Sequence, residues 1–201
     1  MTKESLSFTF KGERKYVQGP DIIDAVIPLV INNFGNEVKQ LRYVAHKMLY
    51  TNADVFFDEV PHSNLNSLLQ FNHENRILYA SIVENRVPIK RSVEFDEKEI
   101  QNLCIIGEGQ IRMEGRVDTK FSLSEVIVSM NKFFLQNNRE AKGKWIVTKI
   151  EYDSIDLINE YMNAEKLTLI LLKNLNNKLT KSAICFDTKK IGHVYFSLIE
   201  Q

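Results

Sequence analysis

The residue best placed to do chemistry is Asp21, which follows Gly19-Pro20 at the start of an apolar run. A proline suits the first turn of a helix, so these residues are expected at a helix N-terminus. A carboxylate there could act as a general base or as a nucleophile on a carbonyl group, and the Gly19 N–H could face a developing oxyanion. Asp24, one turn later, is a further catalytic candidate. The alternative is that Asp21 and Asp24 only cap the helix and complement its dipole, while Gly19 only forms a turn.

Two histidines form a second group of candidates. His46 lies in an expected strand and could serve as an acid or a base beside a helix. His62 lies in a polar loop, and loops often carry function. The alternatives are a structural strand histidine and a solvated loop histidine. A binding site would also need convergent polar side chains, for which the candidates are Gln18, Tyr50 and Asn52.

Basic residues precede the apolar run and its counterpart later in the chain. Arg14 and Arg116 could bind phosphate oxygens, although a solvated strand face explains them equally well. The four histidines are scattered, and Cys104 and Cys185 are far apart and in no CxxC pair. We therefore expect neither a metal site nor a disulfide.

The composition is that of a globular protein. The chain has 201 residues, of which 44% are hydrophobic, and Lys+Arg balances Asp+Glu at 26 each. This balance gives no global attraction to nucleic acid or anionic membranes. The first ten residues show no basic segment followed by an apolar run, and residues 22–31 are about half as long as a membrane span. We therefore expect a cytoplasmic protein with no nucleic-acid partner and no membrane span.

An internal repeat divides the chain. Three ungapped blocks align with a second set, with insertions only between the blocks: 10–34 with 111–135, 42–55 with 144–157, and 68–86 with 171–189. Asp21 then aligns with Ser122, which is the asymmetry expected when one copy of a duplicated site is lost. Asp24 aligns with Glu125, so an acid stands at this position in both copies. Two unrelated segments of similar composition are the alternative. The repeat predicts one module over 1–96, a connecting segment over 97–109 with a short helix, and a second module over 110–201.

Each repeat has the pattern of a strand, a long helix and several further strands. The first helix has almost no polar face, so it should be buried nearly all round, and Gly35 should end it. The second helix starts at a capping box, Ser122-Leu123-Ser124-Glu125. The strands are expected at 6–17, 40–57, 67–72, 76–84 and 88–95, then at 145–153, 167–172, 181–187 and 193–199. Polar turns are expected at 73–75 and 174–178.

This element order and its duplication resemble the hotdog fold of thioesterases and dehydratases, in which a sheet wraps around a long helix. The resemblance covers residues 8–198. It implies an α+β protein of two tandem hotdog-like modules, each with a long buried helix wrapped by an antiparallel sheet, paired as a pseudo-dimer. The Asp-x-Asp-x-x-Gly-His and His-Phe-Pro stretches of two branches of the superfamily do not occur in the sequence.

The resemblance also implies a ligand, an acyl thioester carried by coenzyme A or by an acyl carrier protein, at one asymmetric site between the modules. Asp21, with His46, would activate water or move a proton in a thioesterase or dehydratase-like reaction, and Arg14 and Arg116 would meet the phosphates of coenzyme A. No cofactor is expected beyond coenzyme A or phosphopantetheine as part of a substrate. The alternative is a non-catalytic ligand-binding or scaffold protein. The chain would be a monomeric pseudo-dimer or a higher homo-oligomer.

Overall fold

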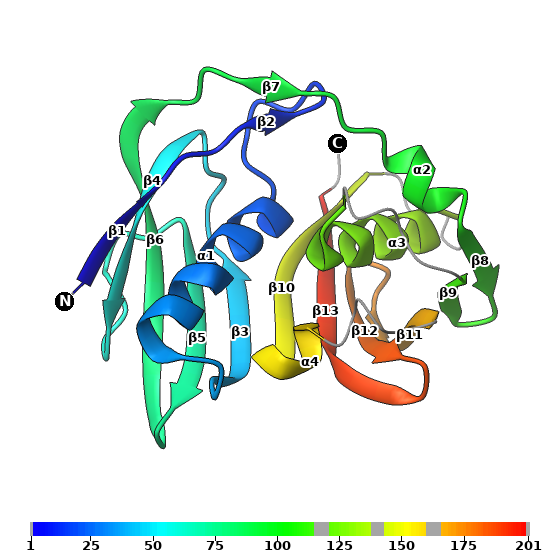
Figure 1. Cartoon of the computed structure of the whole chain (residues 1–201). Helices are drawn as coiled ribbons and strands as arrows, with labels where there is room; N and C mark the ends of the chain where they lie inside the picture. The colour runs from blue at the N-terminus through cyan, green and yellow to red at the C-terminus, as the bar shows by residue number, and fades with distance from the viewer. Residues whose placement is uncertain (1, 115–120, 138–142, 160–165, 200–201) are drawn as a thin grey trace. The chain divides into compact units, whose positions relative to one another are not determined.

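The computed structural model describes residues 2–114, 121–137, 143–159 and 166–199 (Figure 1). The chain divides between Asp96 and Glu97 into two compact units. Each unit contains one long helix and one antiparallel sheet, so the fold is α+β as the sequence predicts. Within the described residues, no helix is long and apolar enough to cross a membrane.

In the first unit, five strands form one antiparallel sheet in the order β1-β4-β6-β5-β3. These strands are β1 (Thr2–Leu6), β3 (Lys39–Ala45), β4 (Thr51–Asp58), β5 (Ser67–His73) and β6 (Arg76–Pro88). Two short strands, β2 (Phe10–Lys11) and β7 (Ser92–Val93), pair in parallel outside this sheet. The segments 6–17, 40–57 and 88–95, each predicted as one strand, are therefore divided into shorter elements. An apolar pattern does not show where the chain leaves one neighbouring strand and pairs with another.

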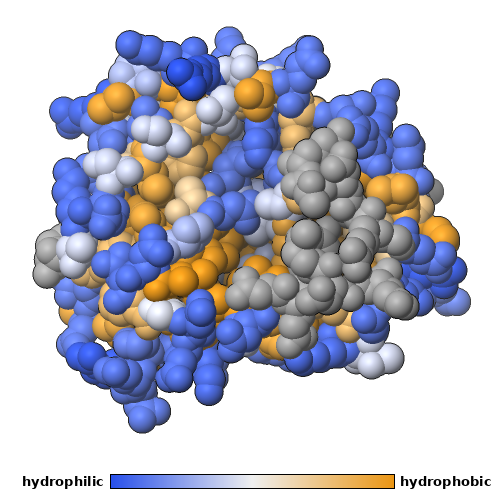
Figure 2. All heavy atoms as spheres, viewed as in Figure 1, coloured by the Kyte–Doolittle hydropathy of each residue, from blue (hydrophilic) through white to orange (hydrophobic). Residues whose placement is uncertain are grey.

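The helix α1 (Gly19–Phe34) lies against this sheet (Figure 1). Gly35 ends it as predicted: its φ is 77°, and its N–H donates to the Ile31 carbonyl at 2.8 Å. The prediction of burial nearly all round is only partly right. Val26 and Val30 are buried, but Pro28 is exposed, and apolar atoms reach the surface in the part of the unit where α1 lies (Figure 2).

The second unit has a sheet in the order β10-β13-β12-β11-β9-β8, again antiparallel throughout. Its strands are β8 (Cys104–Gly107), β9 (Gln110–Glu114), β10 (Lys144–Ser154), β11 (Lys166–Leu175), β12 (Leu179–Phe186) and β13 (Lys189–Ile199). Three helices accompany them: α2 (Glu97–Gln101), α3 (Leu123–Asn137) and α4 (Ile155–Asn159). The expected connecting segment, 97–109, carries α2 and β8, and α2 packs on α3 through the ion pair of Glu97 with Lys132 at 2.7 Å.

Two tight hairpins lie where the sequence predicts polar turns. Glu74 and Asn75 connect β5 to β6, and both have positive φ. Asn176 and Asn177, also with positive φ, lie between β11 and β12. Asparagine tolerates this left-handed conformation better than most residues, which accounts for its repeated use at these turns.

The two sheets differ in strand order, and this difference bears on the internal repeat. The third aligned block places Leu68 on β5 and Leu171 on β11. However, β5 lies between β3 and β6, whereas β11 lies between β12 and β9. The block therefore aligns strands that hold different positions in their sheets, and the duplication stays a prediction from the sequence.

The capping box at the start of α3 is confirmed. The Glu125 N–H donates to the Ser122 hydroxyl oxygen at 3.1 Å, and the Ser122 N–H donates to the Glu125 carboxylate at 2.8 Å. These reciprocal bonds satisfy two N–H groups that have no partner within the helix. At the corresponding position of α1, Gln18 is the N-cap residue, and its side chain makes no capping hydrogen bond.

This difference between the two helix starts can be measured. Replacement Ser122→Ala should lower the free energy of unfolding by about 1 kcal/mol, because the Glu125 N–H loses its acceptor. The matched replacement Gln18→Ala should change it by less than about 0.5 kcal/mol. Urea denaturation followed by circular dichroism would measure both variants, and equal losses would contradict the capping role of Ser122.

Candidate active site

Backbone hydrogen bonds hold the segment that leads into α1 at two places. In the β2–β7 pair, the Phe10 and Gly12 N–H groups donate to the carbonyls of Arg91 and Val93 at 3.0 and 2.9 Å. Closer to the helix, the Val17 N–H donates to the Leu49 carbonyl at 2.8 Å. These bonds fix the segment that carries Lys11 relative to the first turn of α1.

Asp21 and Lys11 form an ion pair at this place. The Lys11 ammonium Nζ lies 2.5 Å from Asp21 Oδ1, and the two side chains are only 23% and 11% exposed. An ion pair with so little exposure is screened less by water than a surface pair is. The pair joins a carboxylate base to an ammonium proton donor, which is a combination that acid–base chemistry requires.

Tyr43 of β3 and Ser67 of β5 lie in the buried layer of the same unit, with 2% and 0% of their surfaces exposed. Burial, together with the negative charge of Asp21, raises the pKa of the Tyr43 hydroxyl well above its ordinary value, although the Ser67 hydroxyl opposes the shift. Neither hydroxyl makes a well-formed hydrogen bond within the described residues. Tyr43 therefore stays protonated and keeps an unused donor within electrostatic reach of Asp21.

The helix starts correct the sequence alignment of this region. The Ile22 N–H bonds to the Gln18 carbonyl, and the Val126 N–H bonds to the Ser122 carbonyl, so Gln18 and Ser122 are equivalent N-cap residues. Asp21 is then equivalent to Glu125, not to Ser122, and Asp24 is not the counterpart of Glu125. Both helices carry an acid at the third position, but Glu125 closes a capping box whereas Asp21 turns to Lys11.

The predicted partnership of Asp21 with His46 is not seen. His46 follows the end of β3 and is exposed. Its backbone N–H donates to the Asn66 carbonyl at 2.9 Å. Within the described residues, no hydrogen bond or ion pair joins the His46 ring to Asp21. The sequence places both residues near the helix, but the ring direction depends on the strand end, which the pattern does not specify.

Gln18, Gly19 and Asp24 lie at the start of α1 as predicted, and all three are half-buried. The first N–H groups of a helix have no acceptor within the helix, so this end carries positive potential. Pro20 contributes no N–H, whereas the Gly19 N–H could meet an oxygen next to Asp21.

The other predicted ligand-binding residues have structural contacts. The buried Asn52 side chain accepts the Phe8 N–H at 2.7 Å and donates to the Pro88 carbonyl at 3.4 Å. Tyr50 is 56% exposed. The His62 ring stacks on Phe56 with the ring centres 5.2 Å apart. These contacts tie neighbouring segments together, and none of them involves Asp21.

The structure describes one of the two arginines that were predicted to bind phosphate. The Arg14 guanidinium lies 5.8 Å from the ring centre of Phe95, over which the Lys11 ammonium also lies at 5.5 Å. Arg14 is therefore near the Lys11–Asp21 pair. Arg116 lies outside the described residues.

Two further polar clusters were not predicted. In the second unit, Glu151 accepts hydrogen bonds from Lys149 and Tyr195, both at 2.7 Å, with His193 at 3.7 Å. Burial raises the pKa of Glu151, but these hydrogen bonds and the charge of Lys149 outweigh it, so the pKa is lowered overall. Burial, followed by the charges of two other lysines, lowers the pKa of His193, so its ring is neutral near pH 7. The negative charge of Glu151 is therefore paired with the positive charge of Lys149 within this cluster.

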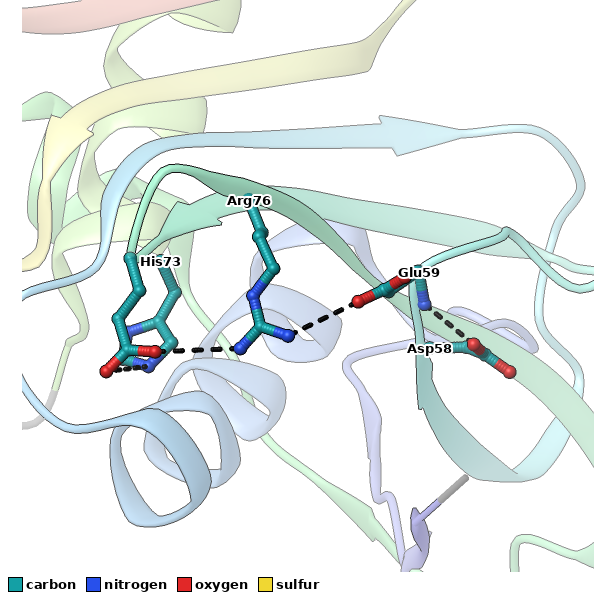
Figure 3. A network of polar contacts seen from close by, with 5 residues as sticks. Asp58, Glu59, His73 and Arg76 are labelled. Atoms are coloured by element: carbon teal, nitrogen blue, oxygen red, sulfur yellow. Dashed lines mark hydrogen bonds and ion pairs between the residues drawn. The ribbon is translucent and has the colours of Figure 1, made fainter.

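The other cluster joins the end of β4 to the β5–β6 hairpin in the first unit (Figure 3). Arg76 lies between Glu59 and Glu74, with nitrogen-to-oxygen distances of 3.4 and 3.6 Å, and these three side chains are more than half exposed. Exposed pairs of this kind contribute at most about 1 kcal/mol to stability. We assign this cluster to the surface of the hairpin and not to a site.

The sequence reasoning missed the role of Lys11 as the partner of Asp21, and it also missed Tyr43. In the sequence, Lys11 is one of several basic residues that precede the helix. Its spacing of ten residues from Asp21 signals nothing by itself, because the contact depends on the β2–β7 pair. Tyr43 reads as an ordinary aromatic residue in a strand, and only its burial beside Asp21 distinguishes it.

No protein-family model matches the sequence, and no curated protein matches it. Solved structures do match. The chain is similar to the dehydratase domain of PpsC from Mycobacterium tuberculosis, solved in complex with C12:1-CoA, with 8% identity, 98% of this chain and 92% of that chain covered, and a TM-score of 0.52. A trans-AT polyketide synthase dehydratase domain from Brevibacillus brevis matches with 10% identity, coverage of 98% and 94%, and a TM-score of 0.50.

A monomeric dehydratase domain from a trans-AT polyketide synthase split module also matches, with 7% identity, coverage of 99% and 100%, and a TM-score of 0.52. These dehydratase domains have a hotdog fold. At identities this low, the similarity concerns the fold and not the residues of the site. The chain therefore has a hotdog fold, which confirms the resemblance drawn from its element order.

Proposed function

We propose that the protein binds an acyl thioester and acts on it at the start of α1 in a dehydratase-like or thioesterase reaction. The observation that carries this proposal is the similarity to dehydratase domains over nearly the whole chain, one of them solved with C12:1-CoA. The Lys11–Asp21 pair supports it, since it places acid and base groups at a helix end inside a hotdog unit. We also propose that each compact unit is one hotdog module.

In this proposal Asp21 is the base and Lys11 is the acid. In hydrolysis, Asp21 takes a proton from water as the water oxygen bonds to the carbonyl carbon, and the sulfur leaves with a proton from Lys11. In dehydration of a 3-hydroxyacyl thioester, Asp21 takes the proton from C2, and the C3 hydroxyl leaves as water with a proton from Lys11. In both reactions the Gly19 N–H polarises the thioester carbonyl.

A second candidate function is non-catalytic binding of an acyl thioester, or a scaffold role on the same fold. Two observations favour it. The Lys11 ammonium already occupies Asp21 Oδ1, and His46, the expected second catalytic group, is exposed and makes no described contact with Asp21. A carboxylate held by an ammonium ion is a weaker base than a solvated one.

Binding can be tested by thermal unfolding in the presence of free coenzyme A, acyl-coenzyme A esters of increasing chain length, and the matching fatty acids. A ligand that binds only the folded state raises the midpoint of unfolding. We expect a rise that grows with acyl length, because each added methylene buries more apolar surface. Absence of a response to every ester, and to acyl carrier protein esters, would contradict the proposed ligand class.

Chemistry at Asp21 can be tested with Asp21→Asn. This variant keeps the shape but cannot accept a proton, so turnover should fall by about 100-fold or more, while the midpoint shift caused by the ester is retained. Release of free thiol measures hydrolysis, and formation of the conjugated enoyl thioester measures dehydration.

The matched control is Asp24→Asn, which removes an acid one turn further along the same helix and should leave turnover unchanged. Full turnover in the Asp21 variant would eliminate Asp21 as the base. Binding without turnover in the unmodified protein would favour the non-catalytic candidate.

A further inference from the structure

The hairpin formed by β11 and β12 is basic, although the chain as a whole has no net charge. Residues 166–186 contain four lysines and neither an aspartate nor a glutamate. Lys173 of β11 lies directly opposite Lys181 of β12. Like charges that face each other across two strands are destabilising, and within the described residues neither lysine forms an ion pair. Stability of the sheet therefore does not account for this pair of lysines.

The two lysines lie on the face of the second sheet that is turned away from α3. Side chains alternate between the two faces of a strand. One row of directly opposed residues crosses four strands and consists of Lys173, Lys181, Tyr195 and Lys149. Tyr152 of β10 lies on the other face, because its hydroxyl is 3.3 Å from the Ser124 hydroxyl of α3. We call the face that carries the lysine row the outer face.

Exposed aliphatic side chains share the outer face with the lysines. Leu175 and Leu179 are opposite one another at the end of the hairpin, and they are 60% and 48% exposed. Ile170 and Ile199 lie on the same face and are also exposed. The pairing of β9 with β11 ends at Ile170, so the end of the hairpin extends beyond this neighbouring strand. The outer face thus presents aliphatic groups and ammonium groups together.

The kinds of residue in the hairpin distinguish a lipid partner from a protein partner. The contact surfaces of protein complexes are enriched in aromatic residues, Met and Arg, and they are depleted in Lys. Residues 166–182 contain no aromatic residue, no Met and no Arg, but four lysines. A bilayer that contains anionic lipids attracts lysines near its surface and takes up leucine side chains at the boundary between head groups and acyl chains. A second copy of this chain would bring like charges together.

We infer that the outer face of the β11–β12 hairpin binds the surface of a membrane that contains anionic lipids. Lys173 and Lys181 meet the lipid phosphates, while Leu175 and Leu179 enter the boundary between head groups and acyl chains. The binding is peripheral, so the chain does not cross the bilayer, and it does not depend on the proposed reaction. Charges more than about 8 Å apart are largely screened at physiological salt, so acids elsewhere in the chain do not cancel this attraction.

The test is co-sedimentation of the full chain with two kinds of vesicle, one of phosphatidylcholine alone and one of equal parts phosphatidylcholine and phosphatidylglycerol. We expect binding to the anionic vesicles to be at least about tenfold stronger. It should weaken when the salt concentration is raised from about 0.1 M to about 0.5 M. Lys173→Gln should weaken it about fivefold, and Leu175→Asn about tenfold. Both side chains are exposed, so both variants should fold, which circular dichroism would check.

The matched controls lie in the β5–β6 hairpin of the first unit. There Arg76 is held between Glu59 and Glu74 (Figure 3), and Ile77 is an exposed aliphatic residue next to it. Arg76→Gln and Ile77→Asn should leave binding to the anionic vesicles unchanged. They remove the same kinds of group from a hairpin whose cation is already paired with carboxylates.

Three results would overturn the inference. The first is equal binding, or no binding, to the two kinds of vesicle. The second is a loss in the control variants as large as the loss in the Lys173 and Leu175 variants. The third is unchanged vesicle binding in the Lys173 and Leu175 variants, and the occupant of the outer face would then be an acidic protein surface or a second copy. Light scattering would identify a second copy, because Leu175→Asn would then convert a dimer into a monomer.

Discussion

Each unit is organised by the need to cover an apolar helix. An α-helix with apolar residues on several sides is stable only when another element removes those residues from water. In the first unit, α1 buries Ile22, Ile23 and Val26, and in the second unit α3 buries a larger share of its residues. A curved antiparallel sheet meets this need, which is why two sheets with different strand orders can both serve.

Because the helices are buried, the N–H groups of their first turns need hydrogen-bond acceptors. The first N–H groups of a helix need acceptors, and an acid at the third position is one way to supply them. Glu125 does this in α3 through its capping box with Ser122. Asp21 holds the same position in α1 but is paired with Lys11, so the capping requirement does not explain its contacts. This difference is the strongest reason to look for chemistry at α1 and not at α3.

Much of the fold could be predicted from the sequence, because local signals determine it. The capping box at Ser122, the end of α1 at Gly35 and the Glu74-Asn75 turn depend on residues that are close in the chain. Strand order is different, since the Leu-Leu pairs of β5 and β11 align in the sequence and yet the two strands hold different positions in their sheets. For the same reason Asp21 could be chosen as a candidate from the sequence, whereas Lys11 could not be named as its partner.

Several buried polar groups have no hydrogen-bond partner within the residues that the structure describes. A layer between a helix and a sheet needs only apolar side chains, yet Tyr43 and Ser67 place hydroxyls there in the first unit, and Asn131 places an amide there in the second. Sequences that fold well avoid such unpaired groups unless something else requires them. A polar group that makes no hydrogen bond within the protein can make one to water or to a ligand without losing an internal bond.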